Sequence, residues 1–187
     1  MEATKDLLVI CHRVALPRWN LGPLKIVLIS DSHACWPFVS LARLRRIVGQ
    51  VNALAPDLIL HGGDFIVPRR PFWRAASPEE AVAPFAELSA PLGVFAVLGN
   101  HDYTDDPTRG AKRGKTPTVV HALADTGVTL LRNTGRIIPF GDAGFFLGRC
   151  RALPIAGRAI FTAGGPLRRR SCHRGLSTGA AAGAKRS

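Results

Sequence analysis

Three short motifs rich in aspartate and histidine each follow a run of apolar residues. The motifs are Asp31-Ser32-His33, Gly63-Asp64 and Gly99-Asn100-His101-Asp102, and the runs before them are Ile26–Ile29, Leu58–Leu60 and Val94–Leu98. Apolar runs of this length, bounded by turn residues, are typical of buried parallel strands. Ligands bind beyond the carboxyl ends of the strands in an open sheet of this kind, so we expect these side chains to meet at one edge.

Carboxylate, amide and imidazole groups gathered at one edge are ligands for a divalent metal ion, and no thiolate is needed. This donor set points to hydrolysis. Each motif alone has a simpler explanation, because Asp and Asn often stabilise turns by bonding to the local backbone. The three together favour a metal site, since each motif stands at the same end of its strand. Gly99 and the Gly62-Gly63 pair would let the backbone turn sharply beside a small ligand.

The same motifs resemble the signature of the calcineurin-like metallophosphoesterases, which runs Asp-x-His, then Gly-Asp, then Gly-Asn-His-Asp/Glu. The resemblance covers the chain from about Pro17 to Leu147. It is similar to a bacterial branch in which Pro-x-Trp and Leu-Lys-Ile precede the first motif, here Pro17-Arg18-Trp19 and Leu24-Lys25-Ile26. The resemblance implies an α/β fold, a four-layer α-β-β-α sandwich that is incomplete at its C-terminus in this chain.

The resemblance also implies a role for each motif residue in a centre of two divalent ions, which in the family are Mn, Fe, Zn or Mg. Asp64 would bridge both ions, Asp31 and His33 would complete the protein side of one, and Asn100 would bind the other. His101 would act near the leaving oxygen as a general acid or as a stabiliser of developing charge, oriented by Asp102. The substrate class that follows is a phosphate mono- or diester.

Later parts of the family signature, an isolated His and then Gly-His-x-His, have no match in the sequence. Beyond His101 only His121 and His173 remain, the first inside a predicted helix and the second without another His two residues away. Losing even groups that support a metal ligand costs ~10–100-fold in affinity or activity. We therefore expect a phosphoesterase whose activity is impaired. The chain is expected to retain either both metal ions or only one.

Periodicity indicates the remaining elements. Strands are predicted over Leu7–Leu16 at an edge, over Leu24–Ser30, Asp57–His61 and Val94–Leu98 in the centre, and over Val128–Leu131, Arg136–Phe140 and Gly144–Leu147 as a meander. Helices are predicted over Ser40–Leu54, from the capping box Ser77-Pro78-Glu79-Glu80 to about Leu88, and from Thr116-Pro117 to Gly127. The alternation of strands and helices favours helices packed on a largely parallel sheet.

Composition changes abruptly after Leu147. Residues 1–147 carry 16 Lys/Arg and all 13 Asp/Glu, a net charge of +3, whereas residues 148–187 carry 9 Lys/Arg and no acid, a net charge of +9. We therefore divide the chain into a metallophosphoesterase domain over 1–147 and a basic tail, rich in Arg, Ala and Gly, over 148–187. The tail has no clear helix or strand periodicity, so disorder is expected there.

The basic tail supports an alternative of a different class, a non-catalytic protein that binds nucleic acid or an anionic membrane. We expect no specific nucleic acid partner, because the tail has no aromatic residues interleaved with its charges. The sequence has no apolar run long enough to span a membrane, no apparent signal peptide, and four cysteines without a metal or disulfide spacing. These features favour a cytoplasmic location, with peripheral attachment to the membrane left open, and they leave the oligomeric state undetermined.

A shift of reading frame in the gene would explain the tail, because a GC-rich coding sequence read out of frame yields Arg, Ala, Gly and Pro. We predict such a frameshift near the codons for Leu147–Arg151. Translating the nucleotide sequence in the other two forward frames should recover acidic residues, strand patterns, an isolated His and Gly-His-x-His. If neither frame stays open or encodes those histidines, the tail is native and the prediction fails.

Overall fold

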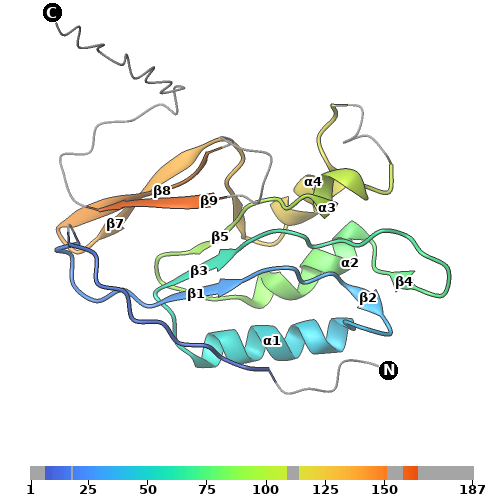
Figure 1. Cartoon of the computed structure of the whole chain (residues 1–187), viewed down its shortest axis with the longest axis horizontal. Helices are drawn as coiled ribbons and strands as arrows, with labels where there is room; N and C mark the ends of the chain where they lie inside the picture. Colours follow the sequence, from blue (N-terminus) through green and yellow to red (C-terminus); the bar gives the residue numbers. More distant parts are fainter. Residues whose placement is uncertain (1–6, 18, 109–113, 151–157, 164–187) are drawn as a thin grey trace, which may run out of the picture.

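A computed structural model of the chain describes residues 7–17, 19–108, 114–150 and 158–163, with side chains as far as Gly148. At its centre lies a four-stranded parallel sheet in the order β1-β3-β5-β6 (Figure 1). Its strands are β1 (Ile26–Ile29), β3 (Leu58–His61), β5 (Val94–Ala96) and β6 (Thr129–Leu130). The predicted parallel sheet is therefore confirmed. Its fourth strand, β6, was expected in the meander and instead pairs with β5.

Helices cover one face of this sheet. They are α1 (Leu41–Ala53), α2 (Pro78–Val82), the 3-10 helix η1 (Ala83–Glu87) and α4 (Thr118–Ala124). Ser40 caps α1, and Ser77 with Glu80 forms the predicted capping box of α2. The helix expected to reach Leu88 changes to 3-10 geometry after Val82, because Pro84 has no N–H to continue the α-helical pattern.

The opposite face packs against a second, antiparallel sheet of β7 (Gly135–Phe140), β8 (Ala143–Cys150) and β9 (Arg158–Ala163). Successive residues of β3 point to opposite faces: Ile59 joins the core under the helices, while Leu58 and Leu60 join the core under the second sheet. This arrangement explains why β3 is apolar throughout. The described residues thus build three layers of the expected sandwich, in the order helices, parallel sheet, antiparallel sheet.

Two expectations at the ends of the chain differ from the structure. Leu7–Leu16 forms no strand, and its side chains are largely exposed, because no strand in the described part of the chain offers it backbone partners. Within the predicted tail, β9 pairs with β8, since backbone hydrogen bonds do not require an alternating apolar pattern. The remainder of the tail, 151–157 and 164–187, lies outside the described residues, so its disorder stays a prediction.

Short elements extend from the carboxyl ends of the parallel strands. They are β2 (Cys35–Trp36), β4 (Arg74–Ala75) and α3 (His101–Thr104). The two short strands pair with each other, and α3 begins within the third motif. Among the described residues, none of the helices is both long and apolar enough to cross a membrane.

One histidine is part of the core. The His61 ring lies parallel to the Phe65 ring, with centroids 4.0 Å apart, and its Nδ1 accepts a hydrogen bond from the N–H of Gly63. Only 3% of the residue is exposed. Burial penalises the charged imidazolium and lowers the pKa of His61 to about 3.

This buried histidine should make stability depend on pH. The unfolded chain binds a proton at His61 below about pH 6.5, whereas the folded chain does not until about pH 3. The free energy of unfolding should therefore fall as the pH drops below 6.5, by up to ~1.4 kcal/mol per pH unit. Urea unfolding at pH 7.5, 6.5 and 5.5 measures this slope. His61→Phe should flatten it and the exposed-site control His12→Ala should not; equal slopes in all three proteins would contradict the prediction.

Candidate metal centre

The three sequence motifs meet at one end of the parallel sheet. The loop after β1 carries Asp31 and His33, the loop after β3 carries Asp64, and the segment after β5 leads into α3 with His101. Backbone hydrogen bonds join the first two loops: the N–H of Asp31 donates to Gly63, and the N–H of His33 donates to Asp64. The predicted convergence of the motifs at one edge is therefore present in the structure.

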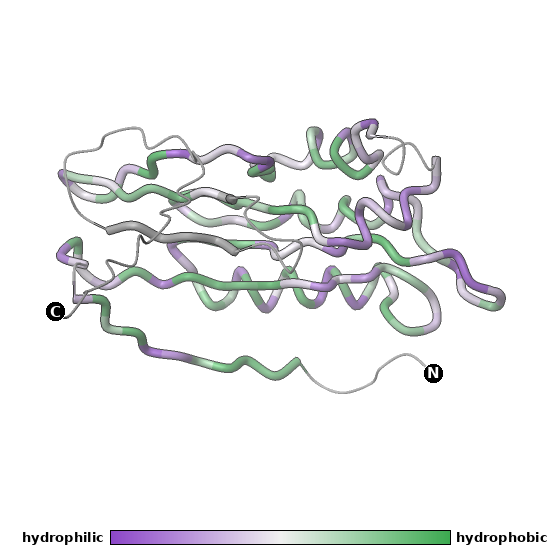
Figure 2. The backbone as a smooth tube through the Cα atoms, turned by 45° about the horizontal axis from the view of Figure 1, so that its top comes forward, coloured by the Kyte–Doolittle hydropathy of each residue, from purple (hydrophilic) through white to green (hydrophobic). Residues whose placement is uncertain are grey.

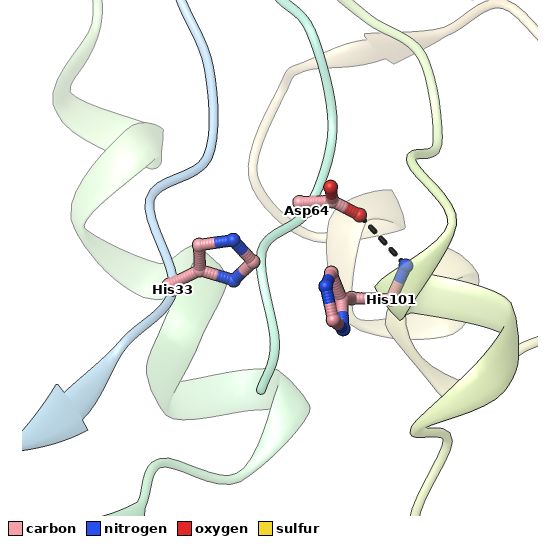
Figure 3. Close-up of side chains that lie close together, drawn as sticks. All are labelled: His33, Asp64 and His101. Atoms are coloured by element: carbon pink, nitrogen blue, oxygen red, sulfur yellow. Dashed lines mark hydrogen bonds between the residues drawn. The ribbon is translucent and has the colours of Figure 1, made fainter. Parts of the chain in front are cut away.

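Three of these side chains lie close enough to hold one metal ion. A ligand atom from each of His33, Asp64 and His101 lies within 4.8 Å of the other two (Figure 3). Asp64 is buried, while the side chains of His33 and His101 are 29% and 35% exposed. The centre is thus open to solvent on its histidine side and rigid on its carboxylate side.

Hydrogen bonds fix the orientation of these side chains. The Nδ1 of His33 lies 3.0 Å from the carbonyl oxygen of Ile66, which assigns the proton to Nδ1 and leaves Nε2 free to bind a metal. The Asp64 Oδ1 accepts a hydrogen bond of 2.8 Å from the N–H of His101. A mixed oxygen and nitrogen donor set of this kind suits Mn, Fe or Zn ions.

Backbone strain is concentrated in these loops. Asp31, His33 and Asp64 all have positive φ angles, of 54°, 38° and 58°. Residues with a Cβ rarely adopt this conformation, and such outliers cluster at functional sites where the surrounding structure holds them. The observed strain supports a functional role for the loops after β1 and β3.

Two glycines let the loops approach each other. A Cβ on Gly99 would lie 2.1 Å from the Asp64 Oδ1, and a Cβ on Gly63 would lie 2.1 Å from the backbone nitrogen of Gly99. No side chain fits at either position. The Gly in the second and third motifs is therefore needed for the contact between the β3 and β5 loops.

Comparison with known proteins agrees with this geometry. A sequence model of the family described as calcineurin-like phosphoesterase matches residues 24–173. The chain belongs to the calcineurin-like phosphoesterase family. The match continues past Leu147, where the composition changes.

Several curated relatives match part of the chain. It is 34% identical over 114 residues to UDP-2,3-diacylglucosamine pyrophosphatase LpxG of Chlamydia trachomatis, covering 57% of this chain and 33% of that protein. It is 29% identical over 156 residues to phosphodiesterase YaeI of Escherichia coli, covering 79% of this chain and 54% of that protein. It is 34% identical over 80 residues to the uncharacterized metallophosphoesterase YkuE of Bacillus subtilis, covering 42% of this chain and 26% of that protein. The chain thus spans between about a quarter and about half of the length of these relatives.

Two predicted ligands of this family member lie beside the cluster. Asp31 is exposed, and its Oδ1 lies 3.6 Å from the Nε2 of His33, the atom that is free to bind a metal. Asn100 immediately precedes α3, and its side chain makes no capping hydrogen bond to that helix. The roles of both residues as ligands stay predictions.

Asp102 has a different place from the one expected. Its carboxylate is fully buried and accepts three backbone hydrogen bonds of 2.9 Å, from the N–H groups of Asp64, Phe65 and Gly99. Burial raises the pKa of Asp102, against the lowering effect of these donors. Since the donors occupy both oxygens, the prediction that Asp102 orients the His101 ring is corrected: Asp102 fastens two loops together.

The carboxylate beside the His101 ring belongs to Asp105. Its Oδ2 lies 2.5 Å from the Nδ1 of His101, across one turn of helix. Sequence reasoning missed this partner because no helix was expected after the third motif. The four-residue spacing between His101 and Asp105 is the signal that could have identified it.

The remaining histidines lie away from this centre or outside the description. His121 is exposed on α4, as its position in a predicted helix indicated. His173 lies outside the described residues. Among the described residues, His121 does not belong to the group of potential metal ligands.

Removing the Asp102 carboxylate should destabilise the protein strongly. Asp102→Ala would leave three N–H donors without a partner, and hydrogen bonds to a charged acceptor contribute ~1.5–3 kcal/mol each, so the loss should exceed ~3 kcal/mol. Urea unfolding at pH 7.5 measures the free energy of unfolding. The matched control Asp105→Asn, whose carboxylate contacts only the His101 side chain among these groups, should stay within ~1 kcal/mol of the parent. Equal stabilities of the two variants would contradict the role assigned to Asp102.

Proposed function

We propose that this chain is a metal-dependent phosphoesterase that hydrolyses phosphate mono- or diesters. The observation that carries the proposal is the convergence of His33, Asp64 and His101 at the carboxyl ends of the parallel strands, where His33 and Asp64 would hold an ion and His101 would face the substrate. Family membership supports it. The names of two relatives, a pyrophosphatase and a phosphodiesterase, both describe hydrolysis at phosphorus.

The residues that would hold the ions are Asp31, His33, Asp64 and Asn100, and Asp64 would be shared between the two ions. Divalent ions, when bound there, would polarise the phosphoryl group and supply hydroxide at neutral pH. Asp64 suits this shared role, because its loop is held to the β1 loop by backbone hydrogen bonds and its own N–H donates to the Asp102 carboxylate that follows β5. The N–H of His101 donates a hydrogen bond to one of the Asp64 carboxylate oxygens, which fixes the orientation of the side chain.

His101 is proposed to donate a proton to the leaving oxygen. The contact with Asp105 fixes Nδ1 of the ring, so Nε2 is the atom left for the substrate. The Asp105 carboxylate would also stabilise the imidazolium form that donates the proton. Asp102 takes part only by holding the loops that carry Asp64 and Gly99.

Activity of this chain is proposed to be weak. The described residues offer one well-formed cluster, and the late histidines of the family signature have no match in the sequence. Fewer ligands lower the affinity for the second ion most, because only Asp64 and Asn100 remain for it. The proposal therefore combines one measurable metal site with slow turnover.

The experiment pairs calorimetric titration of Mn²⁺ with turnover of an aryl phosphate mono- or diester. One measurable ion per chain is expected, with turnover that is slow or below detection. Asp64→Asn should abolish metal binding, because an amide oxygen replaces a charged ligand. Where turnover is measurable, His101→Ala should lower it by ~10²-fold without changing the affinity for Mn²⁺.

The control variant is Asp125→Asn, an exposed carboxylate at the end of α4 that should leave binding and turnover unchanged. Two tight sites per chain, or an Asp64→Asn variant that binds as well as the parent, would overturn the proposed site. Robust turnover that disappears in both His101→Ala and Asp64→Ala would show that the expected impairment is wrong.

A further inference from the structure

A projection built by the strands β2 and β4 stands beside the metal centre. We call it the aromatic lobe, and it comprises residues 35–39 and 69–75. It grows from the loops that carry the proposed ligands, since β2 begins two residues after His33 and the second segment follows Asp64. In Figure 1 it lies at the right-hand edge, beyond the carboxyl ends of the parallel strands.

The lobe exposes large aromatic side chains to solvent. Phe72 is 95% exposed, Trp36 is 62% exposed and Phe38 is 42% exposed. Phe72, Trp36 and Trp73 line an open hollow of about 690 Å³ next to the start of α1. An exposed apolar group of this size marks an interaction site on a folded protein.

The backbone conformation at Phe72 indicates that the exposed ring does not serve the stability of the fold. The N–H of Trp73 donates to the carbonyl of Arg70, which closes a turn with Pro71 and Phe72 at its two central positions. Phe72 has a φ of +67°, the left-handed conformation that Gly or Asn normally provides at the second central position. A glycine would relieve this strain and remove the exposed ring, so the stability of the fold does not explain the phenylalanine.

Arginines are interleaved with these aromatic residues. Arg69, Arg70 and Arg74 are all exposed, and the guanidinium of Arg70 lies 5.3 Å from the centre of the Trp73 ring. The acid that lines the hollow is Glu80, whose carboxylate accepts the capping hydrogen bond from the N–H of Ser77. The lobe is therefore positively charged around its aromatic tip. In Figure 2 the outermost loop at the right is strongly hydrophilic on one side and apolar next to it.

This combination matches the surface of an anionic lipid bilayer. Tryptophan rings settle at the level of the lipid headgroups, a phenylalanine ring can enter the acyl region, and arginines bind lipid phosphates. A site for a free phosphate would need the arginines without the exposed rings. A buried protein contact would not require the charges to surround the tip.

We propose that the aromatic lobe docks on an anionic lipid bilayer, with the Phe72 ring inserted and Arg69, Arg70 and Arg74 on the headgroups. Docking at this position brings the metal centre to the membrane surface. The substrate class that follows is a phosphate ester carried by a lipid. That last step rests on the proposed function, whereas the docking itself does not.

Quenching of tryptophan fluorescence by brominated lipid tests the docking in the full chain. The vesicles contain phosphatidylcholine with one quarter phosphatidylglycerol. Trp36 and Trp73 lie in the lobe, the third tryptophan, Trp19, packs on Phe145 beneath the second sheet, and residues 148–187 contain none. Binding through the basic tail alone therefore leaves the fluorescence of the lobe unquenched.

Quenching of the parent protein is expected, and Phe72→Gly should raise the lipid concentration needed for half-maximal quenching by ~10-fold. The same variant should keep or raise the midpoint of thermal unfolding, because the strained turn is relieved. Arg70→Gln should weaken quenching only at low salt. The matched control is Leu28→Thr, which removes a side chain that is 68% exposed on β1, outside the lobe, and it should behave as the parent.

Three results would overturn the proposal: quenching that Phe72→Gly leaves unchanged, equal quenching by vesicles without phosphatidylglycerol, or lipid-free self-association that Phe72→Gly abolishes in sedimentation experiments. The last result would assign the lobe to a contact between copies of the chain. Asp64→Asn separates the two proposals, because it should remove metal binding and leave vesicle quenching intact. If the parent protein binds no metal ion, the proposed function fails and the docking proposal is unaffected.

Discussion

The candidate metal centre depends on the hydrogen bonds that the buried carboxylate of Asp102 accepts. This carboxylate accepts backbone hydrogen bonds from both sides of a gap, from Asp64 and Phe65 on the β3 loop and from Gly99 on the β5 loop. Burying a charge is costly, and only a full set of donors offsets that cost. With three donors in place, the carboxylate holds two loops at a separation that parallel strands alone would not fix. The Asp64 side chain then returns a contact to the N–H of His101, so the two loops hold each other through both carboxylates.

This arrangement explains where the strain of the site is stored. Positive φ angles at Asp31, His33 and Asp64 would be unfavourable in an isolated loop. Hydrogen bonds from Asp31 to Gly63 and from His33 to Asp64 tie the strained residues to a neighbouring loop that is itself fastened to Asp102. Because the strands beneath them are paired in a parallel register, the loops leave the sheet at the same level. The proposed ligands are therefore positioned by the sheet and oriented by the contacts between loops.

Sequence alone predicted the parts of this site that depend on strand order and local patterns. The apolar runs located β1, β3 and β5, and the rule for parallel sheets brought their motifs to one edge. The sequence alone could not assign the roles of Asp102 and Asp105. Neighbouring carboxylates in one short segment are distinguished only by the direction in which each side chain leaves the backbone. A helix starting at His101 turns Asp102 toward the buried loops and Asp105 toward the histidine ring. The pairing of β6 with β5 was missed for a related reason, since a two-residue strand has no periodicity and its partner is chosen by tertiary packing.

The aromatic lobe and the metal centre have opposite physical requirements although they share the same two loops. Near His33 and Asp64 the chain is held by buried hydrogen bonds, and a few residues further along it exposes Trp36 and Phe72 to solvent. The change occurs at the bonds between Ala34 and Phe65 and between Ala76 and Ala34, which close the base of the lobe. This base joins the lobe to the loops that carry the proposed ligands. If the lobe docks as proposed, the candidate metal centre would face the bilayer while these hydrogen bonds hold the proposed ligands in place, an arrangement that suits an ester held at an interface.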